Sequence, residues 1–350
     1  MERAIVDFNL ALTFDPRSAE AYYNRGLAHS AKGDLDRATA DYDRAIKLNP
    51  RFAHVYSNRG LARLNQGDPV GAIADFDHCL KLNARHADSY YNRGLAWQNI
   101  GNLDKAINDY NKTIEINPRY AEAYVNRGLA YRARGDLDGA MDDFNKALAT
   151  FPIVPTINPR LAAVYNNRGV VRRTKGDLAG AIADFDRAIA LVPHDAKFKS
   201  NRGSARYAMK DLDGAIADFD QALALETSLA ETYNNRGLAR HAKGDLSGAI
   251  ADFDRAIELA PGLADAYHGR GIARYGKNDL DGAIADFDRV IAIDPQQADA
   301  YVNRGLVRLL QGKEAEALLD FEQCLKLNKD LKPMFDEQIK EMKRRLATRR

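Results

Sequence analysis

The triplet Asn-Arg-Gly recurs at a fixed spacing along most of this 350-residue chain. It stands at 24–26 and returns at 58–60, 92–94, 126–128, 167–169, 201–203, 235–237 and 303–305, with Gly-Arg-Gly at 269–271. The spacing is 34 residues, except for one gap of 41 between Asn126 and Asn167. Self-similarity at a period of this length predicts a stack of supersecondary units rather than one large core.

Each unit reads as two helices joined by a tight turn. We number the unit from Ala19, so that glycine is position 8, alanine position 20 and an aromatic residue position 24 in all nine units. The stretch KGDLDRA places glycine at position 15, where it can end a helix in the left-handed conformation, and aspartate at 16, where it can cap the next helix. Apolar residues at helical spacing follow, and proline at position 32 closes the second helix in six units.

The glycine at position 8 needs a physical reason. Glycine in a helix interior costs about 1 kcal/mol relative to alanine, so packing must offset that cost in every unit. In an antiparallel hairpin that turns near position 15, positions whose numbers sum to about 30 lie at similar height. We therefore expect Gly26 to face Ala38 and Tyr42, so that the two backbones approach and the ring fills the gap.

These positions together resemble the tetratricopeptide repeat, a 34-residue helix-turn-helix unit. The matching features are aromatic residues at 4 and 24, glycine at 8, small residues at 20 and 27, and proline at 32, over residues 4 to about 329. The resemblance implies an all-α fold, a right-handed superhelical solenoid of stacked helix-turn-helix repeats. It does not by itself fix a function.

The repeat register predicts how the chain is organised. Residues 1–18 form a half-repeat with a second helix only, 19–152 hold repeats 1–4, 153–161 are a proline-rich insertion, 162–329 hold repeats 5–9, and 330–350 form a capping helix. The capping helix carries the stripe Leu331, Phe335, Ile339, Met342 and Leu346. A hinge could divide the chain near residue 155. The half-repeat is either part of a longer protein or a face that docks onto a partner or a second copy.

Arginine at position 7 and aspartate at position 23 occur in all nine units, as in Arg25 and Asp41. Seven and twenty-three sum to thirty, so each pair should lie level across its hairpin. A ladder of ion pairs inside the scaffold is the favoured interpretation, because every arginine has a partner of its own. The alternative is a row of arginines that binds anions.

Asparagine at position 6 is the candidate for binding. The family resemblance implies that positions 2, 5, 6, 9, 12 and 13 line a concave groove, and that this row is similar to the asparagine ladder of the O-linked N-acetylglucosamine transferase superhelix, which grips peptide backbone. A side-chain amide both donates and accepts hydrogen bonds, so it can hold a peptide group of any sequence. The alternative is that these amides bond within the scaffold or face water.

The predicted peptide-binding residues form this row together with two arginines at position 12. They are Asn24, Asn58, Asn92, Asn126, Asn167, Asn201, Asn235, Asn303, Arg132 and Arg173. The two arginines, with Lys197 and Lys199, favour an acidic peptide.

Composition narrows the class of function. A net charge of +2 gives no argument for nucleic acid, and no apolar run is long enough to span a membrane. Cys79 and Cys324 are far apart and read as buried small residues, and no histidine cluster, phosphate loop or nucleophile motif is present.

We therefore expect a cytoplasmic, non-catalytic protein without metal or cofactor. Its predicted function is to bind an extended segment of a protein or peptide partner, with no nucleic-acid or membrane partner. Self-association through the uncovered half-repeat is a further expectation. The alternatives are a targeting or regulatory repeat region of a larger enzyme, such as a transferase or protease, and a helical-repeat RNA binder.

Overall fold

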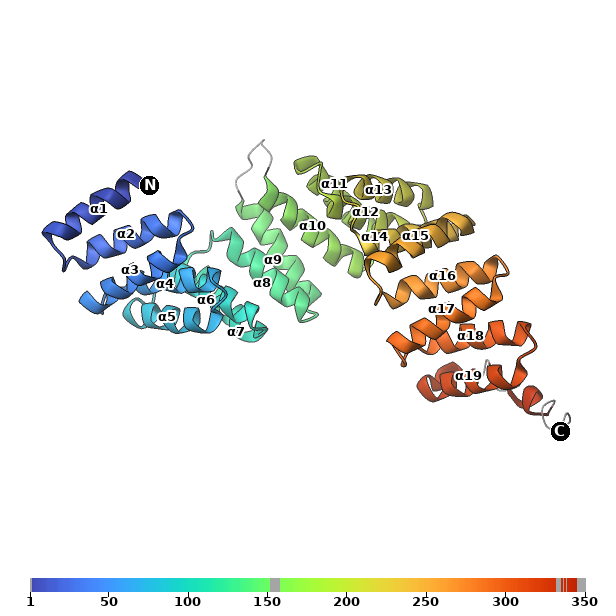
Figure 1. Ribbon diagram of the computed structural model, residues 1–350. Helices are drawn as coiled ribbons and strands as arrows, with labels where there is room; N and C mark the ends of the chain where they lie inside the picture. Colours follow the sequence, from blue (N-terminus) through green and yellow to red (C-terminus); the bar gives the residue numbers. More distant parts are fainter. Residues whose placement is uncertain (1, 152–157, 332–334, 336, 338, 345–350) are drawn as a thin grey trace. The chain divides into compact units, whose positions relative to one another are not determined.

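The computed structural model describes residues 2–151, 158–331, 335, 337 and 339–344, and these are helical or in turns, with no strand among them. The chain forms two compact units, residues 1–175 and 176–350 (Figure 1). The predicted all-α fold of stacked helix pairs is confirmed.

The first unit contains ten helices among its described residues. They are α1 (Glu2–Phe14), α2 (Ala19–Ala31), α3 (Leu35–Leu48), α4 (Ala53–Asn65), α5 (Pro69–Leu82), α6 (Ala87–Asn99), α7 (Leu103–Ile116), α8 (Ala121–Ala133), α9 (Leu137–Thr150) and α10 (Pro159–Thr174).

The second unit repeats the same alternation. Its described elements are α11 (Leu178–Leu191), α12 (Ala196–Ala208), α13 (Leu212–Leu225), α14 (Ala230–Ala242), α15 (Leu246–Leu259), α16 (Ala264–Gly276), α17 (Leu280–Ile293), α18 (Ala298–Leu310), α19 (Glu314–Leu327) and the 3-10 turn η1 (Lys329–Leu331).

The turns inside the repeats follow the expected chemistry. Gly33 and its equivalents at position 15 have φ between +75° and +85°, which glycine adopts without a steric penalty. Aspartate or asparagine at position 16 then caps the second helix, as Asp34 does by accepting from the Arg37 backbone N–H. Lys210 and Asn278 replace the glycine in two repeats and still adopt φ of 66° and 62°. This conformation costs an ordinary side chain such as Lys210 about 1–2 kcal/mol, whereas asparagine adopts it more readily.

The glycine at position 8 packs as predicted. The Gly26 Cα lies against the Tyr42 ring so closely that a Cβ there would approach Cε1 to 2.6 Å. The aromatic residue at position 24 is at most 1% exposed in all nine complete repeats: Tyr42, Phe76, Tyr110, Phe144, Phe185, Phe219, Phe253, Phe287 and Phe321. Where both helices of a repeat belong to the same unit, the ring fits into the hollow that the glycine leaves.

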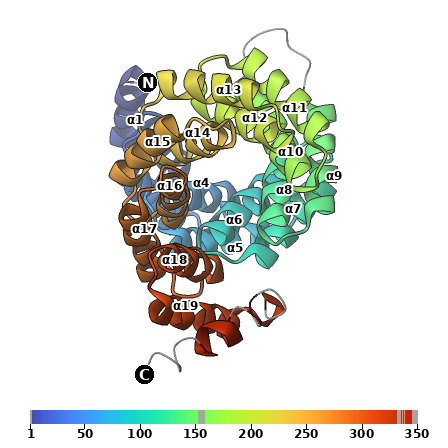
Figure 2. The ribbon, with the colours of Figure 1, turned by 90° about the vertical axis from the view of Figure 1, so that its right-hand side faces the viewer.

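The first helices of neighbouring repeats form one side of each unit. In the first unit α2, α4, α6, α8 and α10 contact one another in series, and in the second unit α12, α14, α16 and α18 do so. Among the described residues, the second helices make no such contacts with each other. Figure 2 shows this arrangement, in which the first helices lie closer together than the second helices within each unit. We call the side made by the first helices the inner face.

The ends of the repeat array differ from its interior. Helix α1 packs on α2 through one side only and leaves Val6, Leu10 and Phe14 exposed. At the other end, Phe335, Ile339 and Met342 are buried against α19, with the Phe335 ring 5.0 Å from that of Phe321. These three residues of the predicted capping stripe therefore cover the last repeat.

Parts of two further predictions lie outside the described residues. They include Leu346 of the capping stripe and most of the proline-rich insertion, residues 152–157, where a hinge near residue 155 was expected. Within the insertion, Pro159 is described and begins α10 directly after the capping residue Asn158.

The fit between glycine and ring gives a test of the packing. Phe253 lies between Gly237 and Gly269, and a Cβ on either would approach the ring to 2.8 or 2.5 Å. Gly237→Ala should therefore destabilise the protein by about 1–3 kcal/mol despite the better helix propensity of alanine. Thermal or urea melts measure this, with Gly262→Ala as control because no atom lies within 4 Å of its added Cβ. An unchanged melt for Gly237→Ala would contradict the packing account.

Candidate functional site

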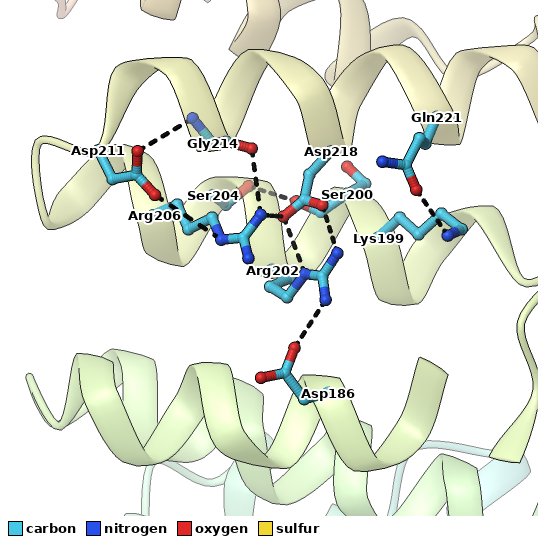
Figure 3. Close-up of polar contacts among 10 residues, drawn as sticks. All are labelled: Asp186, Lys199, Ser200, Arg202, Ser204, Arg206, Asp211, Gly214, Asp218 and Gln221. Carbon is cyan, nitrogen blue, oxygen red and sulfur yellow. Dashed lines mark hydrogen bonds and ion pairs between the residues drawn. The ribbon is translucent and has the colours of Figure 1, made fainter. Parts of the chain in front are cut away.

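The most regular polar feature is a contact made by the arginine at position 7, shown for Arg202 in Figure 3. Its Nε and Nη2 donate to the two carboxylate oxygens of Asp218 at 2.9 and 2.5 Å, across the hairpin of α12 and α13. Its Nη1 donates to Asp186 on α11 at 2.6 Å, in the preceding repeat. One guanidinium therefore closes its own hairpin and joins that hairpin to the one before.

This three-way contact recurs wherever both helices of a repeat belong to the same unit. Arg25, for example, bonds Asp41 at 2.8 and 2.6 Å, and its Nη1 donates to Asn9 of the half-repeat at 2.7 Å. In these repeats the position-23 aspartates are at most 5% exposed. The predicted Arg–Asp ladder is present, so these arginines are held by the scaffold.

Further contacts surround the ladder. In five repeats a second arginine, at position 11, also donates to the aspartate, as Arg206 does to Asp218 at 2.9 Å (Figure 3). The tyrosine at position 4 places its ring 5.4–5.7 Å from the position-7 guanidinium in eight repeats. The hydrogen bonds that Arg202 donates to Asp218, opposed by burial, raise the pKa of Arg202. Arg202 is therefore charged, and the carboxylates of Asp218 and Asp186 balance its charge.

The link between repeats escaped the sequence analysis, although the sequence contains its signal. Position 25 is aspartate or asparagine in the half-repeat and in eight complete repeats: Asn9, Asp43, Asp77, Asn111, Asn145, Asp186, Asp220, Asp254 and Asp288. The ninth repeat has Glu322 there, and Lys343 of the capping segment donates to it at 2.7 Å. The sequence analysis compared only positions within one repeat, so it could not find a partner in the previous repeat.

The Arg127–Asp143 pair gives the simplest test of the ladder, because position 11 of that repeat is Tyr131 rather than arginine. Asp143→Ala leaves a half-buried guanidinium without its bidentate acceptor and should cost about 3–5 kcal/mol. The double variant with Arg127→Ala should cost less than the single one. Urea denaturation measures both, with the exposed neighbour Asp142→Ala as control. A neutral single variant would count against a structural role.

The asparagines at position 6 lie on the inner face, each half-buried. Asn58 Nδ2 donates to the Tyr23 hydroxyl at 3.0 Å, and Asn126 Nδ2 donates to the Tyr91 hydroxyl at 2.7 Å. Both acceptors stand at position 5 of the preceding repeat. Both amides are therefore oriented by a hydrogen bond from Nδ2 to the preceding repeat.

The other asparagines of the row follow variants of this pattern. Asn303 Nδ2 bonds His268 Nε2 at 2.8 Å, Asn235 Nδ2 donates to Ser204 at 3.4 Å, and Asn167 accepts from Arg132 at 3.3 Å. Asn24, Asn92 and Asn201 occupy the equivalent half-buried positions. Several asparagines of the row therefore bond within the scaffold, which was the alternative to peptide binding in the sequence analysis.

The basic residues expected to favour an acidic peptide do not form one described cluster. Arg132 and Arg173 belong to the first unit, whereas Lys197 and Lys199 belong to the second. Arg132 donates to Asn167, and Lys199 Nζ donates to Gln221 at 2.9 Å. Burial lowers the pKa of Arg173. Arg132 and Asn167 are therefore two predicted binding residues that contact each other directly.

Two hollows lie beside this row. In the first unit, a polar pocket of about 470 Å³ is lined by Tyr91, Tyr120 and Glu122, with Asp88 accepting from the Tyr120 hydroxyl at 3.0 Å. In the second unit, an apolar pocket of about 160 Å³ is lined by Asn303 and by Ile272, Tyr275, Phe287, Leu306 and Val307. Each pocket therefore adjoins an asparagine of the row, Asn126 through Tyr91 in one case and Asn303 in the other.

His268 makes the Asn303 contact sensitive to pH. Burial lowers the pKa of His268 from its usual 6.5, and Asp299 and Asp265 oppose this only in part. A histidine with a lowered pKa in the folded state stabilises the protein above the unfolded pKa, and this stability is lost as the pH falls through the folded pKa. Neutral Nε2 can accept from Asn303, whereas the protonated ring cannot.

Acidification from pH 7.5 to 5 should therefore break the Asn303–His268 bond and lower the protection of α16 and α18 amides against hydrogen exchange. His268→Gln should remove that part of the pH dependence. An NMR titration that gives His268 a pKa at or above 6.5 would contradict this account.

The described residues contain no group of three or more His, Cys, Asp or Glu side chains placed to hold a metal. Cys79 and Cys324 are fully buried, and burial raises the pKa of both thiols. Both cysteines therefore fill small positions in the core, as predicted. No helix in the described part of the chain is both long and apolar enough to cross a membrane.

Comparison with protein families agrees with this geometry. Three models described as tetratricopeptide or TPR repeats match residues 19–52, 87–120, 121–152 and 230–263, then 203–244 and 273–312, then 162–195 and 298–331. Together these matches cover most of the chain, which therefore belongs to the tetratricopeptide-repeat family. A search of curated proteins found no match.

Several solved structures share the fold. Cut9–Hcn1 of the APC/C has 17% identity and a TM-score of 0.59, covering 83% of this chain and 56% of that one. A tetratricopeptide-repeat protein from Parabacteroides merdae has 22% identity and a TM-score of 0.55, covering 73% and 98%. Pseudomonas aeruginosa PilF has 18% identity and a TM-score of 0.53, covering 61% and 94%. At these identities the likeness shows the fold alone.

Proposed function

We propose that this protein is a non-catalytic interaction scaffold that binds an extended peptide segment along the inner faces of its units. The observation that carries the proposal is the row of half-buried asparagines, several of which bond side chains of the preceding repeat, as Asn126 bonds Tyr91 at 2.7 Å. The Asn-Arg-Gly triplet would then mark a variant of the repeat in which arginine holds the scaffold and asparagine faces the ligand.

Fixed amides suit this function for a physical reason. A side chain that is already ordered loses little conformational entropy when a ligand arrives. With Nδ2 of Asn58 donating to both Tyr23 and the His54 carbonyl at 3.0 Å, its Oδ1 is presented as an acceptor for a peptide N–H. A row of such acceptors would bind peptide backbone without selecting its side chains.

The two pockets would supply the selection that the asparagines do not. The polar pocket at Tyr91 and Tyr120 offers carboxylate and hydroxyl groups, whereas the pocket at Ile272 and Leu306 offers apolar surface. Tyr275 and Leu306 at its edge are 45% and 40% exposed, which leaves apolar area for a ligand side chain to cover. The second unit should thus prefer a peptide with a bulky apolar residue.

The test is selection from a displayed random-peptide library with the wild-type chain and the variant Asn126→Ala/Asn167→Ala/Asn201→Ala. Each lost amide contact is worth about 0.5–1.5 kcal/mol, so the triple variant should bind the selected peptides at least tenfold more weakly. Fluorescence anisotropy with the selected peptides measures this.

The matched control is Asn108→Ala, because Asn108 is an exposed asparagine on the second helix α7, away from the inner face. It should leave the affinity unchanged. A folded wild-type chain that enriches no peptide, or a triple variant that binds as tightly as wild type, would overturn the proposal.

A further inference from the structure

The inner face of repeats 7–9 carries negative charge that no ion pair with a described residue balances. Position 2 is an acid in all three repeats: Glu231 on α14, Asp265 on α16 and Asp299 on α18. Each acid is exposed and stands one helical turn before position 6, so it shares the face of the asparagine row. No lysine or arginine occupies position 2, 5, 6, 9, 12 or 13 of these repeats. An acid in the first turn also stabilises its own helix, so charge alone does not define a ligand site.

A buried amide oxygen on the same helices lacks a partner. Asn234, at position 5 of α14, is 6% exposed, and its Oδ1 accepts no hydrogen bond from a described residue. In three other repeats the position-5 side chain bonds the position-6 asparagine of the next repeat, as Tyr91 does with Asn126. The repeat after Asn234 has Gly269 at position 6, and a Cβ there would approach the Phe253 ring to 2.5 Å. Asn234 therefore lacks the donor that its equivalents have, which is unfavourable for a buried carbonyl.

Two of the acids flank the place of this missing donor. Glu231 stands three residues before Asn234 and Asp265 four residues before Gly269, spacings that put both carboxylates on the same side of their helices as the amide. Peptide N–H, ammonium and guanidinium groups can all donate to the amide oxygen, but only the last two are also attracted by carboxylates. The side chain of a lysine or arginine therefore matches this place best.

The other edge of the same face is apolar. Ile272 and Leu306 at position 9 and Tyr275 at position 12 line the pocket of about 160 Å³ that adjoins Asn303. Position 9 comes seven residues after position 2, which is about 10 Å along a helix. The acids and the apolar residues therefore form two edges, one on each side of the position-6 row.

An extended segment that crosses these helices can meet both edges at once. Its alternate side chains point in opposite directions, and its backbone N–H and C=O groups point at right angles to the side chains. When the backbone lies on the position-6 row, one set of side chains reaches the acids and the other set reaches the apolar edge.

We infer that the inner face of repeats 7–9 binds an extended segment of a partner protein in which basic residues alternate with bulky apolar ones. The basic side chains pair with Glu231, Asp265 and Asp299, and the apolar side chains enter the pocket beside Asn303. This assignment rests on the proposed peptide-binding function and names the class of peptide. It reverses the expectation of an acidic peptide for this part of the chain, because the basic residues behind that expectation belong to repeats 4–6.

The probes are labelled peptides of equal length, with lysine alternating with leucine, glutamate alternating with leucine, or lysine alternating with serine. Anisotropy should show that the full-length chain binds the lysine–leucine peptide at least tenfold more tightly than either of the others. Added salt should weaken that binding, because it screens exposed charges.

Two variants of the chain test the two groups that select the peptide. Glu231→Gln/Asp265→Asn/Asp299→Asn should weaken binding of the lysine–leucine peptide about tenfold and should not weaken binding of the glutamate–leucine peptide. Asn234→Val should keep or raise the melting temperature, since valine occupies position 5 in two other repeats, yet weaken binding at least threefold.

The matched control is Glu226→Gln/Glu258→Gln/Asp294→Asn. It removes three exposed carboxylates that lie on or at the end of the second helices α13, α15 and α17, away from the inner face. The net charge changes as much as in the acid variant, so the control should bind like wild type.

Two results would contradict the inference while leaving the peptide-binding function in place. One is a lysine–leucine peptide that binds the triple acid variant as tightly as wild type. The other is a set of peptides, enriched from the random library, that lacks lysine and arginine or binds the triple acid variant equally well. A chain that enriches no peptide at all would instead contradict the peptide-binding function, and the inference with it.

Discussion

The contacts of the half-buried guanidinium at position 7 are the interaction on which each repeat depends. A single side chain makes a bidentate pair with its own hairpin and a third bond to the previous one, as Arg202 does with Asp218 and Asp186. The planar fork of arginine provides these donors in fixed directions, which an ammonium group could not. Because the third bond reaches an aspartate or asparagine of the previous repeat, the arginine links consecutive repeats as well as closing its own.

The packing of rings against glycines depends on that closure. Phe219 can lie against Gly203 only while the two helices stay close, and the arginine pair spans the same two helices one residue away. Apolar burial supplies most of the free energy, whereas the charged pair restricts the register in which burial can occur. The two turns with Lys210 and Asn278 show that the hairpin also tolerates an unfavourable backbone conformation where glycine is missing.

The sequence predicted the contacts that lie within a single helix-turn-helix repeat. The helix pairs, the contact of Gly26 with Tyr42 and the pairing of Arg25 with Asp41 follow from spacing alone, because an antiparallel hairpin fixes which positions are level. The role of Asn9 and its equivalents could not follow from that rule, since it depends on how one hairpin stacks on the next. The contacts of Asn58 and Asn126 with tyrosines of the preceding repeat were missed for the same reason. Only the structure shows which polar atoms of these asparagines are bonded within the scaffold.

The position-25 acceptors have a consequence for how such a chain can change its length. Each 34-residue segment contributes one arginine that faces backward and one acid or amide that faces forward. Duplicating or deleting a whole segment therefore leaves an arginine donor and an acceptor at every junction between repeats, because each segment contains one of each. Cutting inside a segment does not, because it separates a position-7 arginine from the position-23 aspartate and the position-25 acceptor of the same segment.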